Sequence, residues 1–161
     1  MNKTDVIIIG AGIAGIASAY YLKKNFPNLS YRIIESRKNV GGTWDQMRFP
    51  GVRADNDMYT YGFSFDPWKG TIIGNGQEIR EYLGQVTEKF NIKNHILFNT
   101  EVLSLSWKNN QWITKTNSKK FSSQYVICCT GSRDKKNPHL QKFRNEKKYQ
   151  GKIVHTQKWG N

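Results

Sequence analysis

The sequence has few acidic residues, little cysteine and no long apolar run. Its two cysteines, Cys128 and Cys129, are adjacent and make a poor structural disulfide, which fits a reducing compartment. No uncharged apolar run approaches the roughly 18 residues of a transmembrane helix. The N-terminus does not resemble a secretion signal, because Asp5 precedes its apolar stretch and glycines interrupt that stretch at once. We therefore expect a cytoplasmic protein without a transmembrane segment.

The shortage of acidic residues leaves a strong positive charge. The 161 residues include 25 Lys and Arg against 12 Asp and Glu, a formal net charge of +13. Most of the excess lies in the second half, with 13 basic and 2 acidic residues from Lys108 onward. Such a half can bind nucleic acid, an anionic surface or phosphorylated small molecules, or it can be an ordinary solvated surface.

The start of the chain predicts a strand, a helix and a second strand. Residues 5–9 (DVIII) form a short run of β-branched residues, typical of a strand buried on both faces of a parallel sheet. A turn with glycines at 10, 12 and 15 follows, then helical spacing over residues 16–25 and a second strand at residues 31–35. The expected fold class is α/β, a Rossmann-like domain built on a parallel sheet.

The rest of the chain predicts one domain with an inserted hairpin. Residues 37–67 have no long period of either kind, whereas residues 76–91 have the apolar face of a helix. Short strands are expected at residues 96–98, 102–107 and 111–116, the last two forming a hairpin, and a buried strand at residues 125–129. No linker separates two domains, and the two cysteines are expected in the core.

The glycine turn predicts a dinucleotide site. Gly10 permits the tight turn, Gly12 lets backbone approach a phosphate, and Gly15 lets helix and strand pack closely. A pyrophosphate there would meet the unpaired N–H groups and the positive end of the helix dipole. Glu35, 20 residues past Gly15, can accept hydrogen bonds from a ribose and would repel a 2′-phosphate. The first site therefore suits FAD or NAD rather than NADP.

Four motifs in the remaining sequence resemble those of a known family. They are GGTWD at residues 41–45, RFPGVRAD at 48–55, DMYTYG with FDPW at 57–68, and YQGKIVHTQKW at 149–159. The last is similar to the F-x-G-x-x-x-H-x-x-x-W fingerprint of Baeyer–Villiger monooxygenases, with Tyr149 in place of Phe. The chain thus resembles the class B flavoprotein monooxygenases, in particular the ethionamide-activating group.

The resemblance implies FAD and NADPH as cofactors and assigns residues to them. Asp55 would support the active site beside the flavin, and His155 would act in domain movement within an inter-domain segment, residues 149–159. The residues implied for FAD are Gly10, Gly12, Ala14, Gly15, Glu35, Gly42, Thr43, Trp44, Asp45, Gln46, Asp55 and Val102. Those implied for NADP are Arg53 and Ala54, the latter standing where relatives commonly have serine. No metal site is expected, because no further His or Cys ligands cluster.

Plainer interpretations stay open for three of these residues. Asp55 could be a loop carboxylate that caps nearby N–H groups, and in an aromatic pocket it would need a cation or donors. Trp44 could be ordinary core packing. His155 could be an interface histidine, and it would share a helix face with Trp159 if that stretch is helical.

The family's chains are much longer than this one, and no second glycine turn for NADPH is present. We therefore expect residues 1–161 to be an incomplete N-terminal FAD-binding domain, whose C-terminal half could be a separate chain. The complete enzyme would use O2 to oxidise a ketone to an ester or lactone, or a thioether at sulfur. The alternatives are a nitrogen- or sulfur-oxidising flavin-containing monooxygenase, which Trp159 argues against, and a non-catalytic basic binding module; no nucleic-acid partner is expected.

Overall fold

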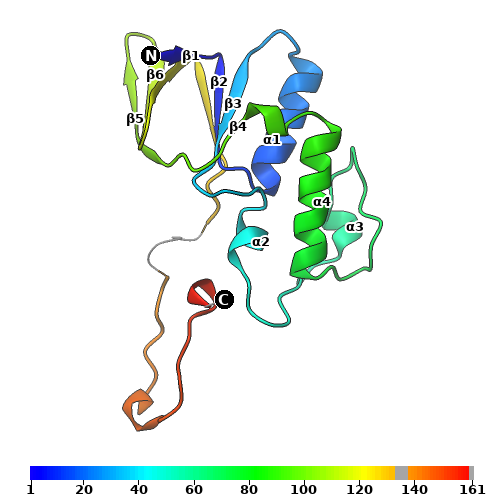
Figure 1. Cartoon of the computed structure of the whole chain (residues 1–161), viewed down its shortest axis with the longest axis vertical. Coiled ribbons are helices and arrows are strands. Elements are labelled where there is room, and N and C mark those ends of the chain that lie inside the picture. The colour runs from blue at the N-terminus through cyan, green and yellow to red at the C-terminus, as the bar shows by residue number, and fades with distance from the viewer. Residues whose placement is uncertain (133–137, 160–161) are drawn as a thin grey trace.

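A parallel four-stranded sheet forms the centre of the computed structural model, which describes residues 1–132 and 138–159 (Figure 1). Its order is β4-β3-β2-β8, and all neighbouring strands are parallel. The strands are β2 (Val6–Ile9), β3 (Tyr31–Ile34), β4 (Ile96–Leu97) and β8 (Tyr125–Cys128). Helix α1 (Ile13–Asn25) connects β2 to β3. The predicted β-strand–helix–β-strand unit and parallel sheet are confirmed.

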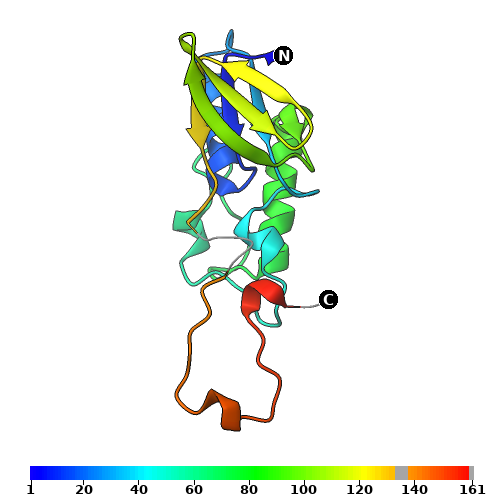
Figure 2. The same cartoon turned by 90° about the vertical axis from the view of Figure 1, so that its left-hand side faces the viewer.

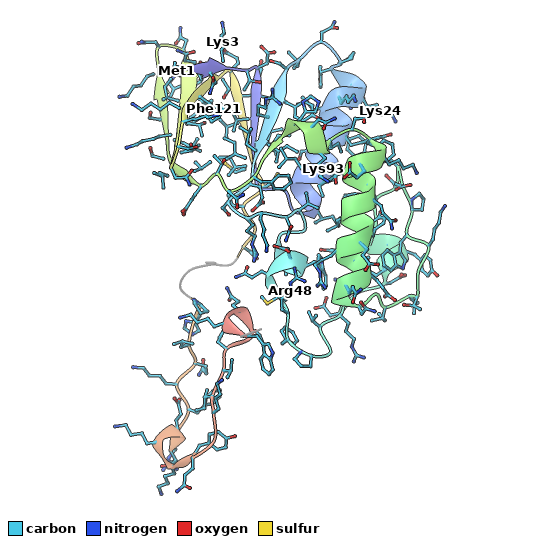
Figure 3. All side chains as sticks on the ribbon, in the orientation of Figure 1. Met1, Lys3, Lys24, Arg48, Lys93 and Phe121 are labelled. Atoms are coloured by element: carbon cyan, nitrogen blue, oxygen red, sulfur yellow. The ribbon has the colours of Figure 1, made fainter. Side chains whose placement is uncertain are left out.

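A second sheet packs against one face of the first. Its order is β1-β7-β6-β5, from β1 (Asn2–Lys3), β7 (Lys120–Ser123), β6 (Gln111–Thr116) and β5 (Val102–Lys108). Asn109 and Asn110 have φ of 50° and 56°, the backbone of a two-residue hairpin turn, so the predicted hairpin is confirmed. Phe121 lies between the sheets and packs with Ile7 and Ile9 (Figure 3).

Helices cover the other face of the central sheet. Val6 and Ile8 of β2 pack with buried residues of α1 and of α4 (Gly76–Lys89), including Ile16 and Leu83. Asn75 caps α4, and Glu78 completes a reciprocal capping box. The alternation along β2 explains the run of isoleucines, since each face of the strand meets a different apolar layer. Among the described residues, no helix has the length and apolar character needed to cross a bilayer.

The long irregular segment contains two short helices. These are α2 (Thr43–Gln46) and α3 (Met58–Tyr61), each a single turn. The described part of the chain also contains the 3₁₀ turns η1 (Lys93–His95), η2 (Glu146–Lys148) and η3 (Thr156–Lys158). Residues 138–159 run out from the body and return toward α2, as both views show (Figures 1 and 2). Residues 133–137 and 160–161 of the predicted basic tail lie outside the described residues.

Several expectations from the sequence were wrong. Helix α1 begins at Ile13 rather than at residue 16, because Gly15 belongs to its first turn. The strand at residues 125–128 is at the edge of the sheet and not fully buried, so Cys128 is exposed and Cys129 is half-buried. Strands β1 and β7 were not predicted. His155 and Trp159 flank a 3₁₀ turn and share no face of an α-helix.

Asp5 joins the starts of two strands and should make stability depend on pH. Its Oδ2 accepts hydrogen bonds from Ser30 N at 2.8 Å and Ser30 Oγ at 2.6 Å, and these bonds lower the pKa of Asp5. The depressed folded-state pKa stabilises the fold above the ordinary value of 3.8, and this contribution is lost as pH falls through the folded-state pKa. We expect Asp5→Asn to lower the urea midpoint at pH 6, and the difference from wild type to shrink toward pH 3. An equal difference at both pH values would contradict this.

Candidate cofactor site

The glycine turn between β2 and α1 is built from close backbone contacts. Gly10 has φ of +102°, and a Cβ there would lie 2.4 Å from the carbonyl oxygen of Cys129. A Cβ at Gly15 would lie 1.9 Å from the carbonyl oxygen of Gly10. Gly12 faces Gly42, whose α-carbon would be 3.6 Å from a Cβ at Gly12. The positive φ of Gly10 fits its expected role in the tight turn, the crowding at Gly15 fits its expected role in close packing, and Gly12 lets the loop after β3 cross the turn.

The N-terminus of α1 has no side-chain cap. Gly12 is the N-cap residue and offers no side chain, and the first turn of α1 contains no acidic residue. Ala14 is exposed in that first turn. Helix α4, by contrast, has a complete capping box. The N–H groups at the start of α1 and the positive end of its dipole can therefore meet an anionic group.

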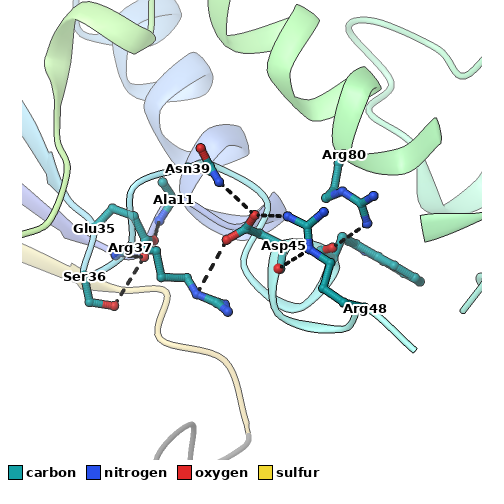
Figure 4. A network of polar contacts seen from close by, with 9 residues as sticks. Ala11, Glu35, Ser36, Arg37, Asn39, Asp45, Arg48 and Arg80 are labelled. Atoms are coloured by element: carbon teal, nitrogen blue, oxygen red, sulfur yellow. Dashed lines mark hydrogen bonds and ion pairs between the residues drawn. The ribbon is translucent and has the colours of Figure 1, made fainter. Parts of the chain in front are cut away.

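Glu35 is buried beside this turn and holds it together. Only 1% of the residue is exposed. Its Oε2 accepts a hydrogen bond from Ala11 N at 2.7 Å, and its Oε1 accepts one from Arg37 N at 2.9 Å and one from Ser36 Oγ at 3.3 Å (Figure 4). Each carboxylate oxygen has two lone pairs, so capacity for a further donor remains. Glu35 thus both fixes the loop and faces the adjoining cavity.

The first cavity, of about 780 Å³, lies between the carboxyl ends of the parallel strands and the second sheet. Glu35 and Val102, which the family resemblance assigns to the adenosine end of FAD, both line it. The remaining lining residues come from the ends of β2, β3 and β8, from the segment before β5, and from β5 itself: Ile9, Gly10, Ile34, Ser36, Thr100, Glu101, Leu105, Cys128, Thr130, Gly131 and Ser132. The carboxyl edge of a parallel sheet is where open α/β folds bind ligands.

Two further cavities continue from the first. The second, of about 350 Å³, includes the glycine turn, Ala14, Gly41 and Gly42, and shares Gly10 and Glu35 with the first. The third, of about 390 Å³, lies on the far side of α2. The second and third share Thr43, Trp44 and Tyr61. Because neighbouring cavities share lining residues, the three lie in a row, called the path below, from the second sheet, past the start of α1, to α2.

Of the four α2 residues implied to contact FAD, two line the cavities and two do not. Thr43 and Trp44 line the path, and Trp44 Nε1 donates a hydrogen bond to Tyr61 Oη at 3.4 Å. Asp45 and Gln46 belong to the lining of none of the three cavities. The Asp45 carboxylate instead makes polar contacts with Asn39 and with two arginines (Figure 4).

Asp55, Arg53 and Ala54 all line the third cavity. Ala54 is buried, and its N–H donates to the Gly74 carbonyl at 2.8 Å. Asp55 and Arg53 are exposed, so Asp55 stands at the rim and not inside an aromatic pocket. Among the described residues, no ion pair includes Asp55.

The returning tail reaches the same cavity. Thr156 is among the lining residues of the third cavity. Next to it, half-buried His155 accepts a hydrogen bond at Nδ1 from Gln157 N, at 3.1 Å. Trp159 is 43% exposed at the end of the segment.

Comparison with known proteins identifies the family. Residues 7–160 match the family model described as pyridine nucleotide-disulphide oxidoreductase. The chain belongs to this family.

The relatives of this chain include proteins described as flavin-dependent monooxygenases. It is 39% identical to a probable FAD-binding monooxygenase, AlmA, of Acinetobacter sp, over 98% of the chain and 33% of the relative. It is 36% identical to the FAD-containing monooxygenase EthA of Mycobacterium tuberculosis, over 96% of the chain and 33% of the relative. Among solved structures, an oxidised steroid monooxygenase bound to NADP matches with a TM-score of 0.83 and 28% identity, over 99% of the chain and 32% of that structure. The predicted resemblance is confirmed, and the chain spans about a third of these proteins.

The cavities also have lining residues to which the sequence analysis assigned no role. Thr130 and Gly131 follow β8 and line both the first and second cavities, and Gly131 has φ of +79°. Tyr61 lines the second and third cavities. The glycine and threonine directly after a predicted strand were a usable signal, since ligands gather at the carboxyl ends of parallel strands. Tyr61 gave no such signal.

Proposed function

We propose that this chain is the FAD-binding, N-terminal part of an NADPH- and O2-dependent flavin monooxygenase. The observation that carries the proposal is the elongated path of three cavities that runs past the uncapped start of α1. A dinucleotide with a flat ring at one end has this shape. The names of the relatives, which include FAD-binding and FAD-containing monooxygenases, support the same cofactor.

The residues along the path fit the parts of FAD in order. Glu35 and Val102 would hold the adenosine in the first cavity. The N–H groups that follow Gly12, including that of Ala14, would meet the pyrophosphate, because no described side chain caps this helix end. Thr43 and Trp44 would wall the flavin ring. FAD would supply the redox chemistry, and the protein supplies orientation, charge and exclusion of water.

The third cavity is the place for the nicotinamide cofactor and substrate. Arg53 and Ala54 would contact NADPH there, and Asp55 at the rim would pair with a cation from the rest of the enzyme. His155 and Thr156 belong to the proposed inter-domain segment, residues 149–159, so its movement would change this cavity. The fingerprint in this segment favours oxidation of a small ketone to an ester or lactone over oxidation of a thioether. We place the protein in the cytoplasm, where both thiols can stay reduced.

Titration of the chain with FAD tests the cofactor assignment. We expect flavin fluorescence to be quenched on binding, ADP to compete, and 2′,5′-ADP to compete at least tenfold less well, because Glu35 repels a 2′-phosphate. Absence of FAD binding, by the chain alone and by the chain refolded with a C-terminal complement, would overturn the proposal. Product analysis of the joined halves with a cyclic ketone and a thioether then decides between ester formation and sulfoxidation.

A further inference from the structure

Trp44 forms the wall common to the second and third cavities, yet its own helix cannot hold it. Helix α2 has four residues, and its N-cap Gly42 makes no side-chain cap bond. A single turn fixes several dihedral angles for very few hydrogen bonds, so its orientation depends on outside contacts. One contact is the Tyr61 hydroxyl, which accepts from the indole Nε1 of Trp44 at 3.4 Å. The other contacts come from α4 and from charged residues around Asp45.

Arg80 ties Trp44 to the rigid helix α4. Its Nη1 donates a hydrogen bond to the backbone carbonyl of Trp44 at 3.1 Å (Figure 4). Gly41 makes room for this contact, since a Cβ there would lie 3.3 Å from Asp45 Cβ and 3.8 Å from Arg80 Cγ. Arg80 lies one turn after the capped start of α4, so its position is well defined.

Asp45 anchors the other side of the same short helix. Its side chain is 8% exposed, and its carboxylate lies 2.7 Å from Arg48 Nη2, 3.7 Å from Arg37 Nε and 3.2 Å from Asn39 Nδ2. Arg48 Nε also donates to the backbone carbonyl of Asp45, at 3.0 Å. The carboxylate that the sequence assigned to the cofactor is thus committed to the protein.

This arrangement of charges is costly and calls for a reason. Three guanidinium groups, from Arg37, Arg48 and Arg80, gather near the single carboxylate of Asp45. Burial and the charge of Arg48 both lower the pKa of Arg80. The contacts that these groups make hold α2 from two sides, through the Trp44 carbonyl and through the side chain and carbonyl of Asp45.

We infer that Arg80 and Asp45 are positioning residues that hold Trp44 against the flavin end of the bound cofactor. The inference rests on the proposed function. The inference predicts different effects at the two ends of the path, because no residue of α2 or α4 lines the first cavity. Loss of Arg80 should therefore weaken the binding of the flavin part and leave the binding of the adenosine part unchanged.

Affinities for FAD and ADP, measured on the same variants, test this separation. We expect Arg80→Met to bind FAD about tenfold more weakly, the effect of one charge-assisted hydrogen bond, and ADP within twofold of wild type. Arg80→Lys, which keeps a donor, should recover most of the FAD affinity. Gln85→Met, at an exposed position of the same helix, is the matched control and should bind both ligands as wild type does.

The outcomes distinguish this inference from the proposed function. If wild type binds no FAD, the proposed function fails. If wild type binds FAD and Arg80→Met either keeps full affinity or loses FAD and ADP affinity equally, the positioning role is overturned. If circular dichroism shows that Arg80→Met does not fold, Asp45→Asn is tested in its place. Asp45→Asn must then weaken FAD binding at least threefold and leave ADP affinity unchanged, or the inference is wrong.

Discussion

Replacing Gly15 by alanine is expected to destabilise the chain by about 3 kcal/mol and to abolish FAD binding. The new Cβ would lie 1.9 Å from the carbonyl oxygen of Gly10 and 3.0 Å from its carbonyl carbon. Both atoms are backbone, so they cannot yield as a flexible side chain does. Relief of the clash must move α1 away from β2 or open the turn, and either shift displaces the helix end proposed to meet the pyrophosphate. The urea midpoint and an FAD titration measure the two effects.

Gly84→Ala is a matched control, for which we expect stability to rise instead of fall. It lies inside α4, and a Cβ there meets nothing within 4 Å. Gly84→Ala should stabilise the chain by about 0.5–1 kcal/mol, because alanine loses less backbone entropy in a helix. If both alanine variants shift the midpoint in the same direction, crowding at the turn is not the cause and the argument for Gly15 fails.

The order of the early elements could be predicted because two local signals agreed. The apolar run of β2 and the glycine spacing each indicated a strand entering a helix, and the second strand followed at the usual distance. The helix over α4 was equally clear, since Ile79, Leu83 and Val86 fall on one buried face. Asn109 and Asn110 marked the hairpin. Where local propensity and tertiary burial agree, the sequence alone is enough to predict a helix or strand.

The errors arose where burial depends on distant parts of the chain. The sequence of β8 resembles that of a central strand, but the strand has a partner on one side only, so Cys128 is exposed at its end. β1 is two polar residues long and exists because it pairs with β7, more than a hundred residues away. No local pattern encodes such pairing. The predicted start of α1 was three residues too late, because Gly15 was assigned to the turn although it lies in the first turn of the helix.

In the candidate site, too, local signals could be interpreted from the sequence and contacts between distant segments could not. Residues on the glycine turn and Glu35 could be identified by spacing, because the turn itself requires them. Asp45 could not be told apart from Thr43 and Trp44, its neighbours in one motif, since only the fold shows that its carboxylate turns toward arginines. Arg80 comes from a separate helix, and no pattern in the sequence links it to Trp44.

Replacing Glu35 by glutamine should cost about 2 kcal/mol of stability and weaken ADP binding at least tenfold. The carboxylate accepts hydrogen bonds from two backbone N–H groups, at 2.7 Å from Ala11 and 2.9 Å from Arg37. Glutamine retains one acceptor oxygen and turns an NH₂ group toward the other donor. Because Glu35 is 1% exposed, water cannot readily replace the lost acceptor. Urea unfolding and calorimetric titration with ADP measure the two effects.

Glu88→Gln is the control for the loss of a carboxylate. Glu88 is exposed on α4 and pairs with Lys93, and exposed ion pairs contribute at most about 1 kcal/mol. Its replacement should shift the urea midpoint little and leave ADP affinity unchanged. If Glu35→Gln behaved as Glu88→Gln does, the Glu35 carboxylate would neither support the turn nor face the nucleotide. The adenosine end of the proposed FAD path would then have to lie elsewhere, since the first cavity, as lined by the described residues, otherwise offers only Glu101 as a carboxylate.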